Sequence, residues 1–280
     1  MKLAYILMAH KNQQQVIRLI KNLNTPNSTF FIHIDKKSEM TLTPDTLGSV
    51  NFELLEREEV NWGGFSQVAA TLKGIKTIVN SADKFDYIIL ISGQCYPIKS
   101  NLMIERFFEE HYGQIFIDYF SMPYDGWDYG GMNRIEQYHF MDQASPDDAT
   151  RKALPPRKFP EYLKPYGGSQ WWCFPLGTAK YVLDFVDNHP DYVEFHKYSF
   201  VPDEMFFQTI LLNADDSEIK DNIVCDGLRY IDWGKPEPPY PAILTSEDFN
   251  SIMNSGKFFA RKFEMSIDSQ VLDMIDEQRQ

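Results

Sequence analysis

The sequence predicts an α/β protein with a Rossmann-like core, because strand-like apolar runs alternate with segments of helical periodicity. Leu3–Met8 is a continuous apolar run, as expected for a parallel strand that is buried on both faces. Apolar residues at helical spacing follow between 16 and 23, and Phe30–Asp35 is a second strand that ends in an acid. Strand, helix and strand in this order open a doubly wound sheet, whose ligands bind at the carboxyl ends of the strands.

The same alternation continues through the rest of the chain. Ser66 precedes an apolar stripe at helical spacing and could cap that helix; the stripe consists of Ala69, Leu72, Ile75 and Val79. Further strands are expected at 52–55, 85–91, 115–119, 166–174 and 228–232, and further helices at 102–110, 178–188 and from about 269. Thr245 and Asp248 resemble a capping box. No repeat or convincing linker divides the chain, so we expect one domain over 1–280.

Composition and charge exclude several classes of protein. The chain has 280 residues, of which 43% are hydrophobic and 24% charged, as in ordinary globular proteins. Its net charge of −13 argues against nucleic acid as a partner and gives no general attraction to anionic membranes. The three cysteines show neither metal-ligand spacing nor a disulfide pattern, which is typical of a reducing compartment. The N-terminal apolar run is too short to span a membrane, so we expect a cytoplasmic protein.

The segment from Phe200 to Leu212 has the features of a helix start. Pro202 suits the first helical position, where its missing N–H would have no partner. Asp203 and Glu204 then fall in the first turn, where the helix dipole favours negative charge. Considered alone, this is a core helix with two acids at its N-terminus.

Together with six other segments, it resembles a known family. In chain order the seven segments are AYILMAHKN (4–12), HIDKKS (33–38), WGGFS (62–66), SGQCYPIKS (92–100), GGSQWW (167–172), PDEMFFQTIL (202–211) and FARKFE (259–264). They are similar to the core 2/I-branching β-1,6-N-acetylglucosaminyltransferases, a family that includes the peptide O-xylosyltransferases. The resemblance implies a GT-A type nucleotide-diphospho-sugar transferase fold, with a central mixed sheet flanked by helices. It also implies a UDP-sugar donor and inversion at the anomeric carbon.

The resemblance implies a role for Glu204. Inverting transfer needs a base that takes the proton of the acceptor hydroxyl. In the branching enzymes this base corresponds to Glu204, whereas the xylosyltransferases use an acid in the GGSxW segment, where this chain has Gln170. We therefore expect Glu204 to be the base, and the sugar to be N-acetylglucosamine or a related one. Asp203 is expected to be either a helix-start residue or a neighbour that orients Glu204. Two alternatives stay open: a xylosyltransferase-like enzyme using UDP-xylose, and a catalytically silent nucleotide- or sugar-binding protein. A glycoside hydrolase is disfavoured, since no second acid in a motif partners Glu204.

A second implication concerns the diphosphate, whose negative charge must be stabilised as UDP departs. The chain contains no Asp-x-Asp, so we expect no metal and no other cofactor. The resemblance instead assigns the diphosphate to Arg261 and Lys262. Branching enzymes carry a second basic residue upstream, where spacing finds Pro239 here. Either Arg261 takes the place of this second basic residue, or the side chain of Lys235 extends to the diphosphate.

The remaining site predictions rest on position and on the resemblance. Residues 1–120 would form the nucleotide-binding half, and 121–280 the acceptor-binding and catalytic half. The aperiodic segment 121–164 is assigned to acceptor recognition. The expected acceptor is a glycan or glycolipid, and the protein could contact a membrane peripherally. Expected nucleotide contacts are His10, Asp35, Trp62, Ser66 and Gln94, and expected substrate contacts are Tyr96, Gln170, Trp171 and Asp203. Asp35 could equally start a turn. Trp171 and Trp172 face opposite ways, so at most one would reach the acceptor.

Overall fold

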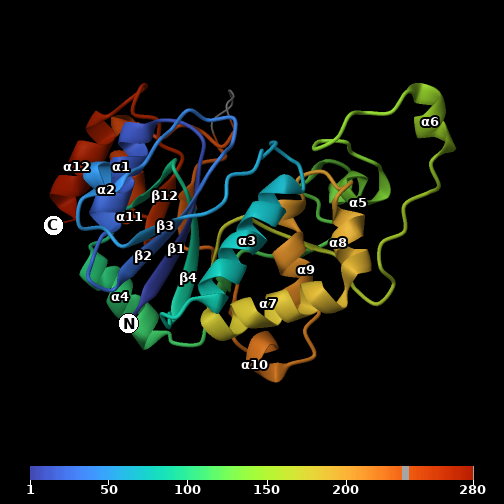
Figure 1. The fold of residues 1–280 in the computed structure, drawn as a ribbon, viewed down its shortest axis with the longest axis horizontal. Helices are drawn as coiled ribbons and strands as arrows, with labels where there is room; N and C mark the ends of the chain where they lie inside the picture. Colours follow the sequence, from blue (N-terminus) through green and yellow to red (C-terminus); the bar gives the residue numbers. More distant parts are fainter. Residues whose placement is uncertain (235–239, 280) are drawn as a thin grey trace. The chain divides into compact units, whose positions relative to one another are not determined.

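The computed structural model describes residues 1–234 and 240–279, which form two compact units. The first unit consists of Met1–Arg57, Ala82–Gly113 and Leu228–Gln280, and the second of Glu58–Ser81 and Gln114–Gly227. The sequence alternates between the two units, and its last stretch belongs to the same unit as its beginning (Figure 1). The functional division of the chain near residue 120 stays a prediction.

The first unit is built on four parallel strands in the order β4-β1-β2-β3. They are β1 (Leu3–Ala9), β2 (Ser28–Ile34), β3 (Phe52–Leu54) and β4 (Tyr87–Ser92). β1 is buried almost throughout, which explains its unbroken apolar run. Helix α1 (Gln13–Leu23) connects β1 to β2 and buries the stripe that the sequence predicts, at Val16, Leu19, Ile20 and Leu23.

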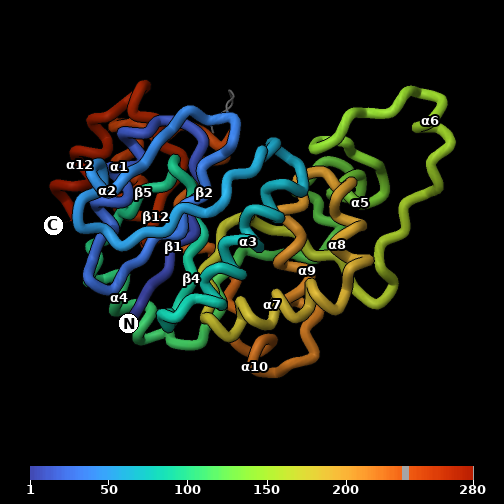
Figure 2. Tube along the Cα trace, in the orientation of Figure 1, coloured from blue at the N-terminus to red at the C-terminus, as the bar shows by residue number. Residues whose placement is uncertain are grey.

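A small second sheet in this unit joins segments that are far apart in the sequence. Its order is β11-β12-β5, with β5 (Cys95–Pro97), β11 (Arg229–Ile231) and β12 (Phe259–Arg261). Figure 2 shows β12 beside β5. The two strands run antiparallel and pair Arg261 with Cys95. The unit's helical elements are α2 (Pro44–Leu47), α4 (Asn101–Glu110), η3 (Ser246–Asp248), α11 (Phe249–Asn254) and α12 (Gln270–Gln278). η3 begins with the predicted capping box of Thr245 and Asp248.

The second unit combines short strands with several helices. β6 (Ile115–Ile117) pairs parallel with β10 (Ile223–Val224) and antiparallel with β9 (Trp172–Pro175), while β7 (Phe120–Ser121) pairs with β8 (Tyr166–Gly167). The main helices are α3 (Ser66–Asn80), α7 (Leu176–Asn188), α8 (Pro190–His196), α9 (Phe206–Leu212) and α10 (Ser217–Lys220). Aromatic rings fill the core, and those of Trp172 and Phe174 stack with centroids 3.9 Å apart. Parallel and antiparallel strands flanked by helices confirm the predicted mixed α/β class.

Two local predictions in the second unit are wrong, and one helix was not predicted. The expected helix at Pro202 is a 3₁₀ turn, η2 (Pro202–Glu204), and α9 begins only at Phe206 after a non-helical Met205. The buried face of α3 carries Val68, Ala70, Thr71, Gly74, Ile75 and Ile78, so it is rotated from the predicted stripe. Helix α8 was not predicted, because its seven residues are too few for a clear period.

The predicted loop 121–164 is only partly irregular. It contains η1 (Asp128–Gly131), α5 (Asn133–Glu136) and α6 (Asp148–Ala153). Its first part packs a small apolar cluster, in which Met122 and Ile135 contact Met205. No residue of α6 is buried, and Figure 1 shows this helix on a loop that extends away from α5 and α8. The segment is therefore anchored at its beginning and exposed at α6.

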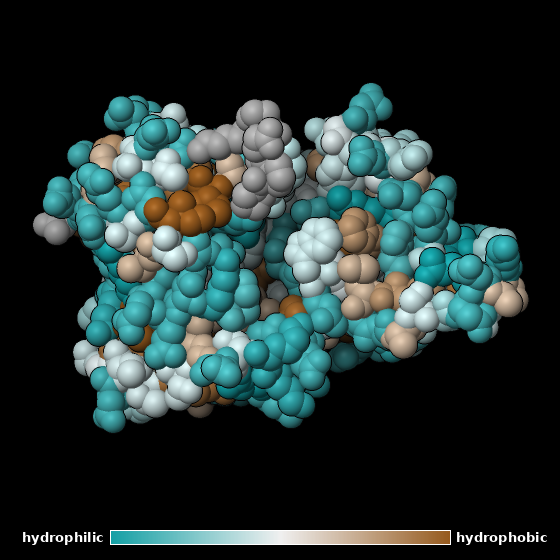
Figure 3. All heavy atoms as spheres, turned by 90° about the horizontal axis from the view of Figure 1, so that it is seen from above, coloured by the Kyte–Doolittle hydropathy of each residue, from teal (hydrophilic) through white to brown (hydrophobic). Residues whose placement is uncertain are grey.

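Figure 3 shows a face of the molecule on which most visible side chains are hydrophilic. Across residues 1–234 and 240–279, no helix has the length and apolar character needed to cross a lipid bilayer.

Candidate functional site

Glu204 is held by an arginine from the segment that the sequence assigns to acceptor recognition. Its Oε2 accepts a hydrogen bond from Nη1 of Arg134 at 2.8 Å. The side chains are 24% and 14% exposed, respectively, so the ion pair is mostly shielded from water. The guanidinium of Arg134 also lies 3.5 Å from the ring centroid of Trp127. On the other side, the backbone oxygen of Glu204 accepts from the N–H of Gly168 at 2.9 Å.

The second carboxylate oxygen of Glu204 has a different environment. Within the described part of the chain, no N–H or O–H donates to its Oε1. A carboxylate that is oriented through one oxygen and open at the other can take a proton from a hydroxyl placed beside it. This is the geometry that a general base requires.

Two of the other predicted substrate contacts, Asp203 and Trp171, are buried. Gln170 donates through Nε2 to Oε1 of Gln67 at 3.1 Å, and its side chain is partly exposed. Trp171 and Trp172 are both buried, so the structure does not support the expectation that one of them reaches a sugar.

The WGGFS segment is organised around Asp142. The carboxylate of Asp142 accepts from the backbone N–H of Ser66 at 2.8 Å and from its hydroxyl at 2.6 Å. Ser66 therefore does not cap α3, and its hydroxyl is committed to Asp142. A Cβ on Gly64 would collide with the same carboxylate, which explains the glycine.

Trp62, from the same segment, is the most accessible aromatic of the predicted site. Its side chain is 72% exposed. Its ring packs edge-on against that of Phe200, with centroids 5.6 Å apart. Phe200 also lies beneath the guanidinium of Arg134, at 5.9 Å. Trp62 thus offers an open aromatic face within the second unit, close to the residues that hold Glu204.

In the first unit, His10 and Asp35 lie just beyond the ends of β1 and β2, as predicted. The backbone N–H of Asp35 donates to the carbonyl of Ala9, so the two strand ends are adjacent. Asp35 also starts a turn, because its carboxylate accepts from the N–H of Lys37 at 2.8 Å. His10 lies at the surface, where partial burial of its ring and the nearby charge of Lys11 lower its pKa.

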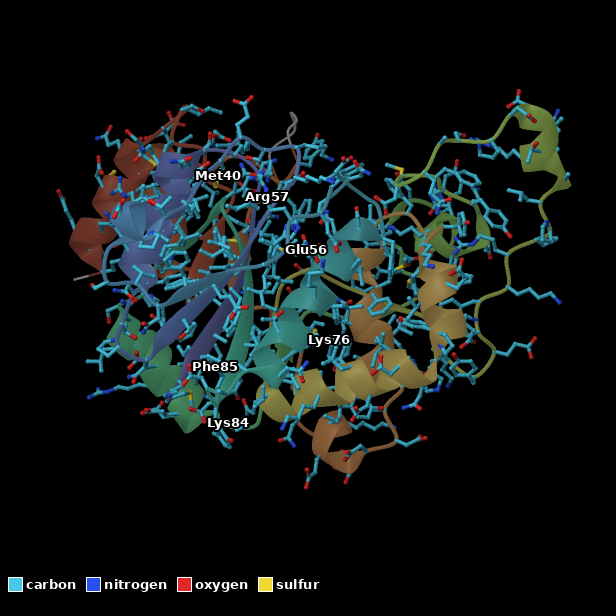
Figure 4. The ribbon with its side chains drawn as sticks, in the orientation of Figure 1. Met40, Glu56, Arg57, Lys76, Lys84 and Phe85 are labelled. Carbon is cyan, nitrogen blue, oxygen red and sulfur yellow. The ribbon has the colours of Figure 1, made fainter. Side chains whose placement is uncertain are left out.

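A cavity of about 390 Å³ opens beside this turn. Its walls come from β2, from the end of β3 and the segment after it, and from residues 40–42; they are Ile32, Ile34, Met40, Thr41, Leu42, Leu54, Leu55, Glu56 and Arg57. Arg57 donates to the carbonyl of Asp35 at 2.8 Å and also to that of Ser38. Met40, Glu56 and Arg57 are labelled in Figure 4. An apolar cavity with one arginine at its rim suits a flat ring with polar edges.

The FARKFE segment lies against the loop after β4. Arg261 ends β12, opposite Cys95 of β5. The N–H of Phe263 donates to the carbonyl of Gln94 at 2.9 Å, so the backbone of Gln94 lies beside the segment that carries Lys262. The contact of Gln94 with the donor stays a prediction. Partial burial and the charge of Arg261, with a smaller contribution from Lys11, lower the pKa of Lys262. A phosphate group would relieve this repulsion between cations.

Tyr96 contradicts its predicted role as a substrate contact. Its ring is completely buried, and its hydroxyl donates to the carboxylate of Asp276 in α12. Burial and the negative charge of Asp276 raise its pKa well above the usual value. Arg18 of α1 binds the same carboxylate at 2.7 Å, so Tyr96 belongs to a structural polar cluster that joins α1 to α12.

Residues 1–234 and 240–279 hold no group of three or more His, Cys, Asp or Glu side chains arranged to bind a metal. The predictions made for Lys235 and Pro239 lie outside the described residues. Sequence reasoning gave no site role to Lys11, Arg57 or Arg134, which contact Glu264, the carbonyl of Asp35 and Glu204, respectively. Lys11 lies within the segment 4–12, and Arg57 follows the strand expected at 52–55; these positions were the only available signal.

Residues 3–253 match the family model described as Core-2/I-Branching enzyme. The chain therefore belongs to the Core-2/I-Branching enzyme family.

Curated relatives are similar along nearly the whole chain. Xylosyltransferase 1 from Homo sapiens is 24% identical over 299 residues, covering 98% of this chain and 30% of the relative. The β-glucuronosyltransferase GlcAT14B from Arabidopsis thaliana is 26% identical over 292 residues, covering 98% of this chain and 65% of the relative. The chain spans about a third of the length of the xylosyltransferases that it matches. A solved putative glucose-1-phosphate thymidylyltransferase from Bacillus anthracis covers 70% of this chain and 85% of its own, with 14% identity and a TM-score of 0.29, too low to inform the fold.

Proposed function

We propose that this protein is an inverting glycosyltransferase that moves a sugar from a UDP-sugar to a hydroxyl of a glycan acceptor, with Glu204 as the general base. The observation that carries the proposal is the hydrogen bonding of the two Glu204 carboxylate oxygens. Arg134 orients it through Oε2, and Oε1 accepts no hydrogen bond within the described residues. In a chain of the Core-2/I-Branching family, a carboxylate with this geometry suits proton removal from an acceptor.

The chemical step is a single displacement. The acceptor oxygen forms a bond to the anomeric carbon while the bond between that carbon and the UDP oxygen breaks. Glu204 receives the proton of the acceptor hydroxyl, and the departing UDP takes the bonding electron pair. Arg134 keeps the carboxylate oriented during this step, and its ring contact with Trp127 limits its own movement.

The donor's diphosphate is assigned to Arg261 and Lys262. Lys262 has an ammonium whose charged form is disfavoured by partial burial and by neighbouring cations. A diphosphate that accumulates negative charge would reverse this penalty, so the lysine stabilises the transition state more than the ground state. We propose that this charge replaces a metal ion. His10, Asp35 and the adjoining cavity with Arg57 then receive the uridine.

Two sugars other than N-acetylglucosamine compete as donors. The relatives are named xylosyltransferases and a β-glucuronosyltransferase, which favours testing xylose and glucuronic acid. Gln170 stands where the resemblance places the xylosyltransferase acid, and it is bonded to Gln67. This observation supports the hexosaminyl donor and Glu204 over a xylosyltransferase-like mechanism.

The test is a two-part donor screen with the purified chain. Thermal shift is measured first with UDP, UMP, GDP and dTDP, and then with UDP-N-acetylglucosamine, UDP-xylose and UDP-glucuronic acid. Slow hydrolysis of each UDP-sugar is followed by UDP release. We expect stabilisation by UDP and release from one UDP-sugar above all others. Binding without any release, with or without glycan acceptors, would make the protein a nucleotide-sugar binder and reject the proposal.

A further inference from the structure

Lys11 directly follows the predicted uridine contact His10, and no site motif assigns it a role. It belongs to a local concentration of positive charge in a chain whose net charge is −13. The neighbouring cations are Arg261 and Lys262, at the end of β12. Lys11 lowers the pKa of both His10 and Lys262, although burial is the larger cause in each case. The ammonium of Lys11 therefore acts on the same part of the first unit as the predicted diphosphate cations.

Glu264 fixes the position of the Lys11 ammonium. Nζ of Lys11 lies 2.5 Å from Oε2 of Glu264, whose side chain is only 7% exposed. The same carboxylate accepts from Asn12, from Nε2 of Gln94 at 3.3 Å and from the hydroxyl of Ser266 at 3.2 Å. It thus joins the segment after β1, the turn after β4 and the segment after β12.

A buried glutamine holds these segments in register. Nε2 of Gln15 donates to the carbonyl of Gly93 at 2.8 Å and to that of Phe263 at 3.0 Å. Its Oε1 accepts from the N–H of Met265 at 2.8 Å. Because these contacts fix the backbone on both sides of Glu264, the distance between Lys11 and the FARKFE segment is set by the fold.

We propose that Lys11 is a further cation for the diphosphate of the donor, and that Glu264 is the positioning residue that holds its ammonium beside Lys262. The inference rests on the proposed function, since it assumes a UDP-sugar donor. An ammonium has three N–H donors, and Glu264 occupies one of them, which leaves two for phosphate oxygens. The Lys11 side chain is 44% exposed, so an incoming ligand can reach it.

This assignment accounts for the second cation that spacing could not find upstream of the FARKFE segment. A lysine on the loop after β1 supplies the charge from a different part of the chain. The carboxyl end of a central parallel strand is also where α/β sheets bind their ligands. Lys262 and Lys11 would then approach the diphosphate from two separate segments, and Glu264 would keep their mutual repulsion from separating them.

The test compares ligands that differ only in phosphate number. UDP, UMP and uridine are titrated by calorimetry into wild type, Lys11→Met and Lys11→Arg. The matched control is Lys21→Met, which removes an exposed lysine from the other end of α1. A charge-assisted hydrogen bond is worth enough that Lys11→Met should bind UDP about 10- to 100-fold more weakly. Uridine affinity should be unchanged, Lys11→Arg should recover most of the UDP affinity, and Lys21→Met should behave as wild type.

Three other results would contradict either the inference about Lys11 or the proposed function. If wild type binds UDP and Lys11→Met binds it equally well, the inference is wrong while the proposed function stands. If Lys11→Met weakens uridine as much as UDP, Lys11 acts through the fold and the inference is also wrong. If wild type binds uridine no more weakly than UDP, the diphosphate site itself is rejected, and the proposed function fails with it.

Discussion

Replacing Glu204 by glutamine should slow transfer strongly while leaving donor binding intact. The substitution keeps the side chain's shape and an oxygen that can accept from Arg134, but it removes the proton acceptor. A positioned general base contributes about 10²- to 10⁴-fold to the rate, so kcat should fall by this factor, or about 2.7–5.4 kcal/mol of barrier. UDP affinity should stay within about twofold of wild type, because the variant does not change Arg261 or Lys262.

The structure also sets the stability cost of this substitution. Exposed ion pairs contribute about 0–1 kcal/mol, whereas breaking a buried pair costs about 3–5 kcal/mol. Glu204 and Arg134 are 24% and 14% exposed, so the free energy of unfolding should fall by an intermediate amount, about 1–3 kcal/mol. At about 2–4 °C per kcal/mol, the variant should melt roughly 2–12 °C below wild type and remain folded in an assay at 25 °C.

The assay measures sugar transfer at saturating donor, UDP affinity by calorimetry and melting temperature on the same preparation. Glu194→Gln is the matched control, since it removes a carboxylate from an exposed ion pair with Lys197 in the same unit. Asp203→Asn is the informative neighbour and should lose far less turnover than Glu204→Gln. Undiminished turnover in folded Glu204→Gln would refute the assignment, and a larger loss in Asp203→Asn would transfer the role to that residue.

Four further outcomes are expected. Transfer should survive EDTA; loss that manganese or magnesium restores would reveal a metal site. Lys262→Ala should lower kcat by about 10²- to 10³-fold, the share of one preorganised charge stabiliser, and a change confined to KM would make it a binding residue only. Because the pKa of Lys262 is lowered, it loses its proton at a lower pH than an ordinary lysine, so calorimetric UDP affinity should fall as pH rises through the alkaline range, less steeply in Lys262→Ala. Tyr96→Phe removes a buried hydrogen bond to Asp276 and should cost about 0.5–1.5 kcal/mol of stability without changing the donor KM; a raised KM would return Tyr96 to the donor site.

Local patterns predicted much of the fold. The apolar run of β1 and the helical stripe of α1 depend on residues that are neighbours in the chain, and both are where the sequence placed them. The capping box at Thr245 is equally local. The α3 stripe was wrong because several apolar residues of that helix permit more than one buried face, and the neighbours that select one are remote in sequence.

The site was harder to predict for the same reason. The ion pair of Glu204 involves Arg134, which lies 70 positions away in a segment without periodicity. The hydroxyl of Tyr96 is bound by Asp276, which is 180 positions away, so its burial leaves no trace near SGQCYPIKS. Spacing could place residues at strand ends, as for His10 and Asp35. It could not show which carboxylate or cation would meet them.

The pairing of β12 with β5 has a consequence for how this protein is made. Cys95 and Arg261 meet across that ladder, so the strand that carries the predicted phosphate cations joins a partner synthesised much earlier. The ribosome synthesises a chain at about 5–20 residues per second, and the N-terminal portion can begin to fold as it emerges. The neighbourhood of Lys11, Glu264 and Lys262 cannot form until the region after residue 258 has left the exit tunnel. A nascent or prematurely terminated chain would therefore have the β1 loop without its counterpart, and the proposed diphosphate site would be incomplete until translation reaches this point.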